Sequence, residues 1–506
     1  MEDIKAIIKL LSKQKVKQIE ILSEESKLSE KSMALYNGIK QGDITNDDEA
    51  SALLYNDDRN NPIYRVLKHR FKERLINTLF FIDVQAYGKS TYQKVLNRSY
   101  KNWAASKLLL DKGLRQTGIN ILETTLISSL KYDIEELSIM IVKDLKMHYG
   151  LFEYNVKKFN KYKSKGVELN QIYNLKLEIE EYYCILGHLI ETKKSVKYTD
   201  QIVQIEKDVI KIHEAGSTID SYYLRFYIFM CLYMIQFIKK DFEKQIQITS
   251  EALTYFETKV GFKKIGTVAF LQIRGIAEMS SGNYDTALNS FHKCLNFKSK
   301  VGGILWQSLH NYIFIIHILK KNYTDAYQIL SHVISHKAFN YKYSDIGQHW
   351  FLKEAFMQFL IRVKKVDSQI VKAQKIRPFR LARLLNETPA LSKDKRGYNV
   401  SIHIIQMLFL IIDEKYDRLI DKLDSLKQYS FRYLRSEEYT RARTFIKMLL
   451  MIPKYDYHTK TILTKTKNLH QKLMDTPMDF SEQAMSIEII PYEQLWEEVM
   501  GLLELI

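Results

Sequence analysis

The sequence predicts an all-helical fold: an α-solenoid of stacked helix pairs, with a small helical N-terminal domain and a helical cap at the C-terminal end. The 506 residues include only 18 Gly and 6 Pro, whereas average usage would give about 35 and 25. Sheets and tight turns use both residues heavily, so the shortage favours helices. No proline lies between Pro62 and Pro378. Within that stretch, apolar residues recur at helical spacing between short polar breaks.

Residues 1–88 form the predicted N-terminal domain. Thr45 and Asp48 make a capping pattern before a short helix at 50–54, and Asn61 with Pro62 starts the next helix. The apolar residues expected on the buried face of that second helix are Ile63, Val66, Leu67, Phe71, Leu75 and Leu79. Another face of the same helix carries the basic residues Arg65, Lys68, His69 and Lys72.

A short motif recurs in the middle of the chain and predicts a repeat array over residues 89–361. Residues 281–291 place an aromatic, a small and a bulky apolar side chain on one face of a starting helix. Further copies open at 239–242, 321–330 and 414–423, and a weaker one lies at 103–126. The aromatic residues Phe242, Tyr284 and Tyr323 are 42 and 39 residues apart. Repetition at this period is typical of stacked helix pairs.

The motif resembles the tetratricopeptide repeat family, most fully over residues 268–300. Gly275 stands where two helices would cross, and Ala287 and Phe291 match the signature of the second helix. The spacing exceeds the family's period of about 34 residues. Four positions depart from the family's preference for Trp, Leu, Tyr and Pro, and they are Leu271, Arg274, Glu278 and Ser299. An irregular helical bundle without true repeats is the alternative.

This resemblance implies a non-enzymatic scaffold or adaptor that binds a protein or peptide on the concave face of the array. No cofactor is expected. The candidate groove residues are Arg274, Glu278, Gln307, His310 and Asn311.

The short helix, turn and basic helix of residues 1–88 resemble the helix-turn-helix portion of regulators that carry such arrays. Arg65, Lys68, His69 and Lys72 would then contact DNA. The second interpretation is therefore a transcription regulator whose repeat array senses a ligand or peptide. A solvated helix face explains the same pattern without DNA.

Charge singles out a basic connecting segment at residues 362–397. The formal net charge is +17, which favours acidic partners such as nucleic acid. Phosphate groups would suit the exposed cations of this segment, so we expect weak nucleic-acid binding there. The predicted anion patch consists of Lys372, Lys375, Arg377, Arg380, Arg383, Lys393, Lys395 and Arg396.

Residues 398–506 are expected to hold a further repeat and an acidic cap. From residue 473 onward the chain has eight acids and no Lys or Arg. Pro491 starts a helix whose apolar stripe needs a surface to cover. That helix closes the solenoid in one interpretation. In the other it detaches and competes with an anionic partner for the basic segment. The apolar stripe comprises Leu495, Trp496, Val499, Leu502, Leu503 and Ile506.

Motifs of enzymes and metal sites are scarce. The sequence contains no GxxxxGK, GxGxxG or GxSxG motif. His332 and His336 are one helical turn apart, but the glutamate of a zinc-protease motif does not follow His332, so no metal is predicted. Arg396 and His403 resemble the Arg and His spacing of all-helical metal-independent ribonucleases. A ribonuclease is therefore the third interpretation.

A cytoplasmic location is expected. Cys184, Cys231 and Cys294 lie far apart and fit a reducing compartment. Charges interrupt the apolar residues of the first segment, unlike a signal peptide. The longest apolar run, 226–238, is too short for a membrane span, so no membrane partner is predicted.

Overall fold

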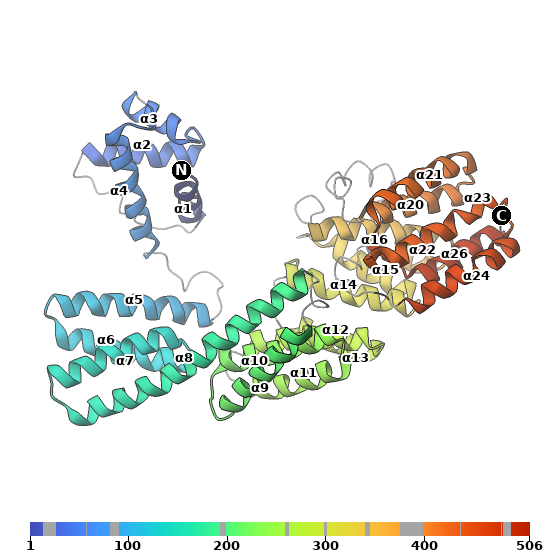
Figure 1. Cartoon of the computed structure of the whole chain (residues 1–506). Helices are drawn as coiled ribbons and strands as arrows, with labels where there is room; N and C mark the ends of the chain where they lie inside the picture. The colour runs from blue at the N-terminus through green and yellow to red at the C-terminus, as the bar shows by residue number, and fades with distance from the viewer. Residues whose placement is uncertain are drawn as a thin grey trace. The chain divides into compact units, whose positions relative to one another are not determined.

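Figure 1 shows a computed structural model of the chain. The structure describes residues 1–13, 27–56, 58–80, 91–192, 199–258, 263–297, 301–337, 339, 345–374, 398–435, 437–476, 478 and 487–505. All regular secondary structure in these ranges is helical, and helices that follow one another in the sequence pack together. The expectation of an all-helical protein is confirmed.

The chain divides into two compact units. Residues 1–180 and 214–225 form the first unit, and residues 181–213 and 226–506 form the second. The helices that begin in the first unit are α1 (Glu2–Lys13), α2 (Lys27–Gln41), α3 (Asp47–Tyr55), α4 (Pro62–Leu79), α5 (Thr91–Asp111), α6 (Arg115–Lys131), α7 (Glu135–Leu151), α8 (Val156–Glu191) and α10 (Tyr222–Lys239). Helices α8, α9 (Thr199–Ala215) and α10 contain residues of both units.

The remaining helices belong to the second unit. They are α11 (Phe242–Glu257), α12 (Lys263–Ser280), α13 (Tyr284–Asn296), α14 (Ile304–Leu319), α15 (Tyr323–Ser335), α16 (Asp345–Arg362), α17 (Ser368–Ala373), α20 (Tyr398–Ile412), α21 (Tyr416–Tyr433), η3 (Glu437–Tyr439), α22 (Thr440–Leu449), α23 (Met451–Lys454), α24 (Thr459–Asp475) and α26 (Tyr492–Leu505).

Helices α1 to α4 share one small core, and α4 corrects part of the expected buried face. Ile63 and Val66 are 63% and 50% exposed, so their assignment to the core was wrong. Tyr64 is buried instead, and its hydroxyl donates a 2.7 Å hydrogen bond to Asp47. The buried face of α4 therefore begins at Tyr64, one residue later than expected. The other buried residues of this line are Leu67, Phe71, Leu75 and Thr78.

The caps of α3 and α4 agree with the sequence to within one residue. Asn46, rather than Thr45, caps α3, and its side chain accepts a hydrogen bond from the backbone N–H of Glu49. The Glu49 carboxylate in turn accepts from the Thr45 N–H. Asn61 caps α4 with Pro62 at the first helical position, as expected.

One turn geometry joins many of the helix pairs. At each such turn a residue with positive φ follows the helix, and the next backbone N–H bonds back to the carbonyl five residues earlier, as in the Schellman motif. In the α12–α13 turn, Gly282 has φ of 81° and the Asn283 N–H donates to Glu278 O at 2.8 Å. The positive-φ residues of these turns are Gly113, Asp133, Lys240, Gly282, Lys321, Lys364, Glu414 and Asp456.

Four of these turns coincide with motif copies seen in the sequence, at Lys240, Gly282, Lys321 and Glu414. The turn at Gly113 falls in the weaker copy. The turns at Asp133, Lys364 and Asp456 were not recognised, because the aromatic residue of the motif is replaced there by Glu135, Val366 and His458.

The crossing of α12 and α13 depends on small residues. A Cβ atom placed on Gly275 would lie 2.6 Å from Cε1 of Phe291, a separation that real Cβ atoms do not show. Ala287 is fully buried in the same pair of helices. The close approach of α12 and α13 therefore fixes these two positions as small.

The acidic C-terminal helix α26 packs on α22 and α24. Leu495, Trp496, Val499 and Leu503 are buried, Leu502 is half-buried, and Ile506 lies outside the described residues. Lys321 and Lys365, at the turns after α14 and α16, pair with Glu497 at 2.5 Å and Glu498 at 2.8 Å. Because α26 contacts two helices and the turns after two others, the interpretation as a fixed cap is favoured over that as a detachable tail.

A buried ion pair holds the segment that leads into α26. Arg441 on α22 pairs with Glu488 at 2.6 Å and also with Glu493, and it donates to Leu473 O at 2.8 Å. Burial raises the pKa of Glu488, and the Arg441 charge opposes that rise.

Across the described ranges, no helix is both long enough and apolar enough to cross a membrane.

Candidate functional site

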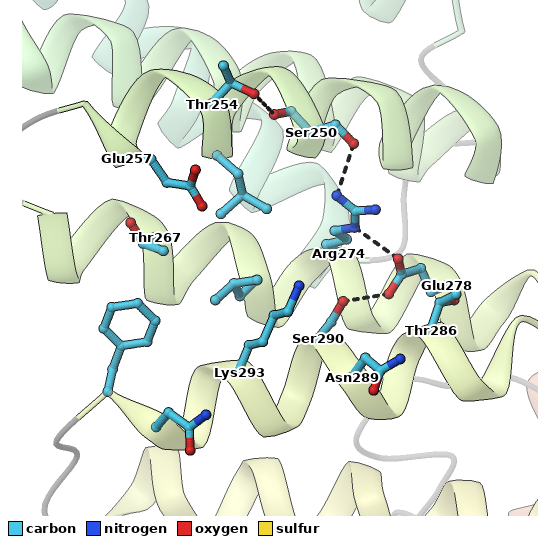
Figure 2. Close-up of a pocket in the computed structure, with 14 residues that line it drawn as sticks. Ser250, Thr254, Glu257, Thr267, Arg274, Glu278, Thr286, Asn289, Ser290 and Lys293 are labelled. Atoms are coloured by element: carbon cyan, nitrogen blue, oxygen red, sulfur yellow. Dashed lines mark hydrogen bonds and ion pairs between the residues drawn. The ribbon is translucent and has the colours of Figure 1, made fainter.

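Three consecutive helices of the second unit, α11, α12 and α13, enclose an open cleft of about 660 Å³ (Figure 2). Lining residues on each helix recur every three or four positions, in places as adjacent pairs, so each helix presents one face to the cleft. A cleft of this size is large enough for a small molecule or a few residues of a peptide. Helix α12 contributes Thr267, Leu271, Arg274 and Glu278.

One end of the cleft is closed by a polar network. The carboxylate of Glu278 is only 3% exposed. It accepts hydrogen bonds from Arg274 Nε at 2.9 Å and from Ser290 Oγ of α13 at 2.7 Å. Arg274 Nη1 also donates to Ser250 Oγ of α11 at 3.1 Å. Because these partners come from all three helices, the network fixes the helix faces relative to one another.

The other end of the cleft keeps its polar groups open. Figure 2 shows Glu257 of α11 and Lys293 of α13 on facing walls. Neither has an ion-pair partner among the residues that the structure describes. Thr267, on the floor, is 3% exposed, and its hydroxyl has no hydrogen-bond partner within the described ranges. Phe297, just after α13, adds an apolar surface at this end.

A second cleft lies between α6 and α8 of the first unit and has a volume of about 650 Å³. Its walls are mostly apolar, with Leu126, Ile127 and Leu130 on α6. At its edge Glu123 accepts hydrogen bonds from Tyr149 at 2.9 Å and from Tyr162 at 3.1 Å.

The charge of Glu123 is stabilised within this second cleft. Burial alone would raise the pKa of Glu123, but the two tyrosine hydroxyls and the charge of Lys158 lower it overall. On α8, Lys165 pairs with Glu168 at 2.7 Å. Most charges around the second cleft are therefore already matched.

The five predicted groove residues do not form one site. Arg274 and Glu278 line the first cleft together. On α14, Gln307 and His310 are buried and do not line it. Gln307 donates to Gly302 O at 2.9 Å, and the side-chain carbonyl oxygen of Asn311 is buried without a hydrogen-bond partner among the residues that the structure describes. Sequence reasoning therefore located one pair of the cleft and added three residues from elsewhere.

His310 belongs to an aromatic cluster. Its ring lies 4.1 Å from that of Trp306 and 5.4 Å from that of His332, and the ring of His336 lies 5.5 Å from Trp306, all measured between centroids. Burial lowers the pKa of His310 to about 4, so the ring is neutral at physiological pH. Within the described ranges, no three His, Cys, Asp or Glu side chains gather in a way that could hold a metal ion.

The basic face of α4 is largely occupied by contacts within its own domain. Lys68 pairs with Asp47 at 2.7 Å and Lys72 with Asp3 at 2.7 Å. Arg65 donates to Asn60 at 3.0 Å, and His69 lies 3.7 Å from Glu73. These neighbours reduce the positive charge that the helix could offer to a phosphate backbone.

The basic connecting segment can be placed in part only. Lys372 is exposed on α17. The other predicted patch residues, Lys375, Arg377, Arg380, Arg383, Lys393, Lys395 and Arg396, lie outside the described residues. The same holds for one member of the Arg396–His403 pair. The other, His403, makes an edge-to-face contact with Tyr429 at 5.5 Å between ring centroids, and burial lowers its pKa to about 4.

No protein-family model, curated protein or solved structure matches this chain. The candidate site therefore rests on its own geometry.

The sequence does carry a signal for the other polar residues of the cleft. Thr254 and Glu257 on α11, and Asn289, Ser290 and Lys293 on α13, fall at three- and four-residue spacing. On each helix these polar residues share one face. The repeat motif is defined by its packing residues, so it does not draw attention to that polar face.

Proposed function

We propose that the chain is a non-enzymatic peptide-binding scaffold, built as a solenoid of divergent tetratricopeptide-like repeats, and that the cleft of α11 to α13 is its binding surface. The observation that carries the proposal is the cleft itself: one face of each of three helices lines it, and the Arg274–Glu278 network anchors one end. A pre-formed cleft lowers the ordering cost of binding, which favours recognition of an extended segment.

The repeat part of the proposal is supported by the turns. Lys240, Gly282, Lys321 and Lys364 share positive φ and are 42, 39 and 43 residues apart. Helix pairs joined at a regular spacing are the unit from which solenoids are built. The spacing and the varied turn residues suit a divergent member of the family.

The departures from the family pattern support the location of the site. Leu271, Arg274 and Glu278 stand where the family prefers Trp, Leu and Tyr, and all three line the cleft. The substitutions place a smaller side chain at the first of these positions and charged side chains at the other two. We infer that they convert a packed helix face into a recognition surface.

A transcription regulator is the weaker alternative, because Lys68 and Lys72 of the basic helix already pair with carboxylates of their own domain. A ribonuclease has less support, since His403 is half-buried against Tyr429. We place the protein in the cytoplasm, an assignment supported by the free thiols Cys184, Cys231 and Cys294.

Selection from a displayed library of random dodecapeptides tests the proposed function. The full-length chain should enrich a defined set of peptides. Asn289→Trp, on the exposed wall of the cleft, should abolish that enrichment because the indole fills the cleft. His292→Trp, exposed on the same helix but outside the lining, is the matched control and should retain it. Equal enrichment by both variants, or none by the native chain, would refute the proposal.

A further inference from the structure

The open end of the α11–α13 cleft has a specific chemical character. Glu257 and Lys293 place one negative and one positive charge on facing walls (Figure 2). Each of the two charges at the closed end, Arg274 and Glu278, already neutralises the other at 2.9 Å. Glu257 and Lys293 are therefore the charged residues of the cleft that remain available to bind a charged ligand.

Thr267 provides a second, independent indication of a ligand. Its hydroxyl is buried on the floor of the cleft and has no hydrogen-bond partner in the part of the chain that the structure describes. A buried polar group without a partner is costly, and most such groups in proteins are satisfied. A ligand that bonds to Thr267 removes this cost, which favours an occupant with a donor or acceptor at the cleft floor.

We propose that this end of the cleft binds a peptide segment that carries one basic and one acidic side chain. The basic side chain pairs with Glu257, the acidic one with Lys293, and a backbone amide of the peptide bonds to the Thr267 hydroxyl. The inference rests on the proposed peptide-binding function and specifies its ligand.

The surroundings favour a mixed-charge peptide over a polyanion. A nucleic acid would bring its phosphates close to Glu257, and like charges repel. Leu253 and Leu271 on the floor and Phe297 at the edge offer apolar contact. The methylene stem of a lysine or arginine packs well on such a surface while its charged end reaches a carboxylate.

Charge reversal on each wall tests this specificity. The native chain, Glu257→Lys and Lys293→Glu are each used to select from the same random dodecapeptide library. The native chain should enrich peptides that contain both signs of charge. Glu257→Lys should favour acidic peptides and Lys293→Glu basic ones, each shifting the ratio of acidic to basic residues by about tenfold, as expected for charge-assisted contacts. Glu251→Lys, exposed on α11 but outside the cleft, is the control and should select the native set.

The outcomes separate this inference from the proposed function. If both reversal variants select the native set while Asn289→Trp abolishes enrichment, the cleft binds peptides but the assigned charge specificity is wrong. If the native chain enriches no peptide, or if Asn289→Trp has no effect, the proposed function fails. Glu257 and Lys293 are exposed, so both variants should fold, and circular dichroism checks this. Thr267→Val removes the hydroxyl at nearly constant volume and should weaken binding of a selected peptide about fivefold or more.

Discussion

The two clefts of this protein differ in how far their charges are satisfied. The cleft of α11 to α13 and the cleft between α6 and α8 have similar volumes, about 660 and 650 Å³. In the first, Glu257 and Lys293 have no ion-pair partner and the Thr267 hydroxyl no hydrogen-bond partner among the described residues. In the second, Glu123 is held by two tyrosines, and Ile127 on the wall is 69% exposed. Two clefts of similar volume therefore differ in their lining: one offers unpaired polar groups, and the other offers mainly apolar surface.

The comparison shows that the residues on one face of each helix decide what a cleft can bind. Apolar walls bind apolar groups without much selectivity, whereas open charges and an unpaired hydroxyl select for a complementary ligand. We therefore expect specific recognition in the α11–α13 cleft and only weak, unselective contacts in the α6–α8 cleft.

Deletion of residues 475–506 should have the largest effect, and it should act on the second unit only. The deletion removes α26 and leaves Arg441 buried without Glu488. Loss of a buried ion pair costs about 3 to 5 kcal/mol, and the exposed apolar surface adds to this. Hydrogen exchange should show strong loss of protection in α20 to α24 and little change in α6 and α7. A folded deletion variant with stronger anion binding would instead show that α26 is a detachable regulator.

Removal of a cation from each cleft should give unequal losses of stability. Arg274→Met leaves the carboxylate of Glu278 buried without its charged partner and should lower the free energy of unfolding by about 3 kcal/mol. Lys158→Met leaves Glu123 one-third exposed and still bonded to two tyrosines. Its cost should be below about 1 kcal/mol. Chemical denaturation of both variants would contradict the account if the losses were equal.

The packing under the first cleft can be tested with a small-to-large substitution. Ala287→Phe should destabilise the protein by roughly 1 to 3 kcal/mol or more, since the buried α12–α13 crossing has no space for the ring. Ala326, fully buried in α15, should behave in the same way. Thr286→Phe is the matched control, because Thr286 is exposed, and it should change the melting temperature little. An unaltered melting temperature for both alanine variants would remove the main support for the repeat packing.

Mild acid should weaken the second unit more than the first. Burial lowers the histidine pKa from its usual 6.5 to about 4 for His310, about 3 for His349 and about 4 for His403. Between pH 6.5 and 4 the unfolded chain binds more protons at these sites than the folded chain, so stability falls as the pH falls. Glu123 in the first unit has a pKa lowered from 4.5. Its contribution is present above pH 4.5 and is lost only as the pH falls below that value.

Hydrogen exchange at pH 7 and pH 5, corrected for intrinsic rates, measures this difference. From pH 7 to pH 5 we expect a loss on the order of 1 kcal/mol for each of the three histidines, confined to the second unit. His310→Phe keeps an aromatic ring beside Trp306 and should reduce the loss. The interpretation is wrong if helices α6 and α7 lose protection as strongly as α14.

The helices were predictable from the sequence because their signals are local. Apolar periodicity and the shortage of Gly and Pro act over one or two turns of the chain. Asn61 with Pro62 marked the start of α4 correctly. Tyr64 displaced Ile63 and Val66 from the buried face because its hydroxyl bonds to Asp47, which precedes it by 17 residues. A periodicity argument within one helix does not include such a contact.

The cleft was predictable only in part, for a similar reason. Arg274 and Glu278 stood out because they depart from the residues that the repeat family prefers at these positions. Their partners Ser250 and Ser290 come from the neighbouring helices, and the sequence does not specify which faces of those helices meet. The turns at Asp133, Lys364 and Asp456 escaped notice because no Phe or Tyr follows them two positions later, as one does in the motif copies.

Photo-crosslinking tests the central claim that the α11–α13 cleft is the site of peptide recognition. Benzoylphenylalanine is placed at Thr254 in that cleft, at Ile127 in the α6–α8 cleft, or at Glu251 outside both. Each protein is irradiated with the same biotinylated pool of random dodecapeptides. We predict labelling at Thr254 at least about tenfold above that at Glu251, with Ile127 between the two, because selective contacts prolong binding. Labelling at Ile127 equal to or above that at Thr254, or equal labelling at all three positions, would contradict the account.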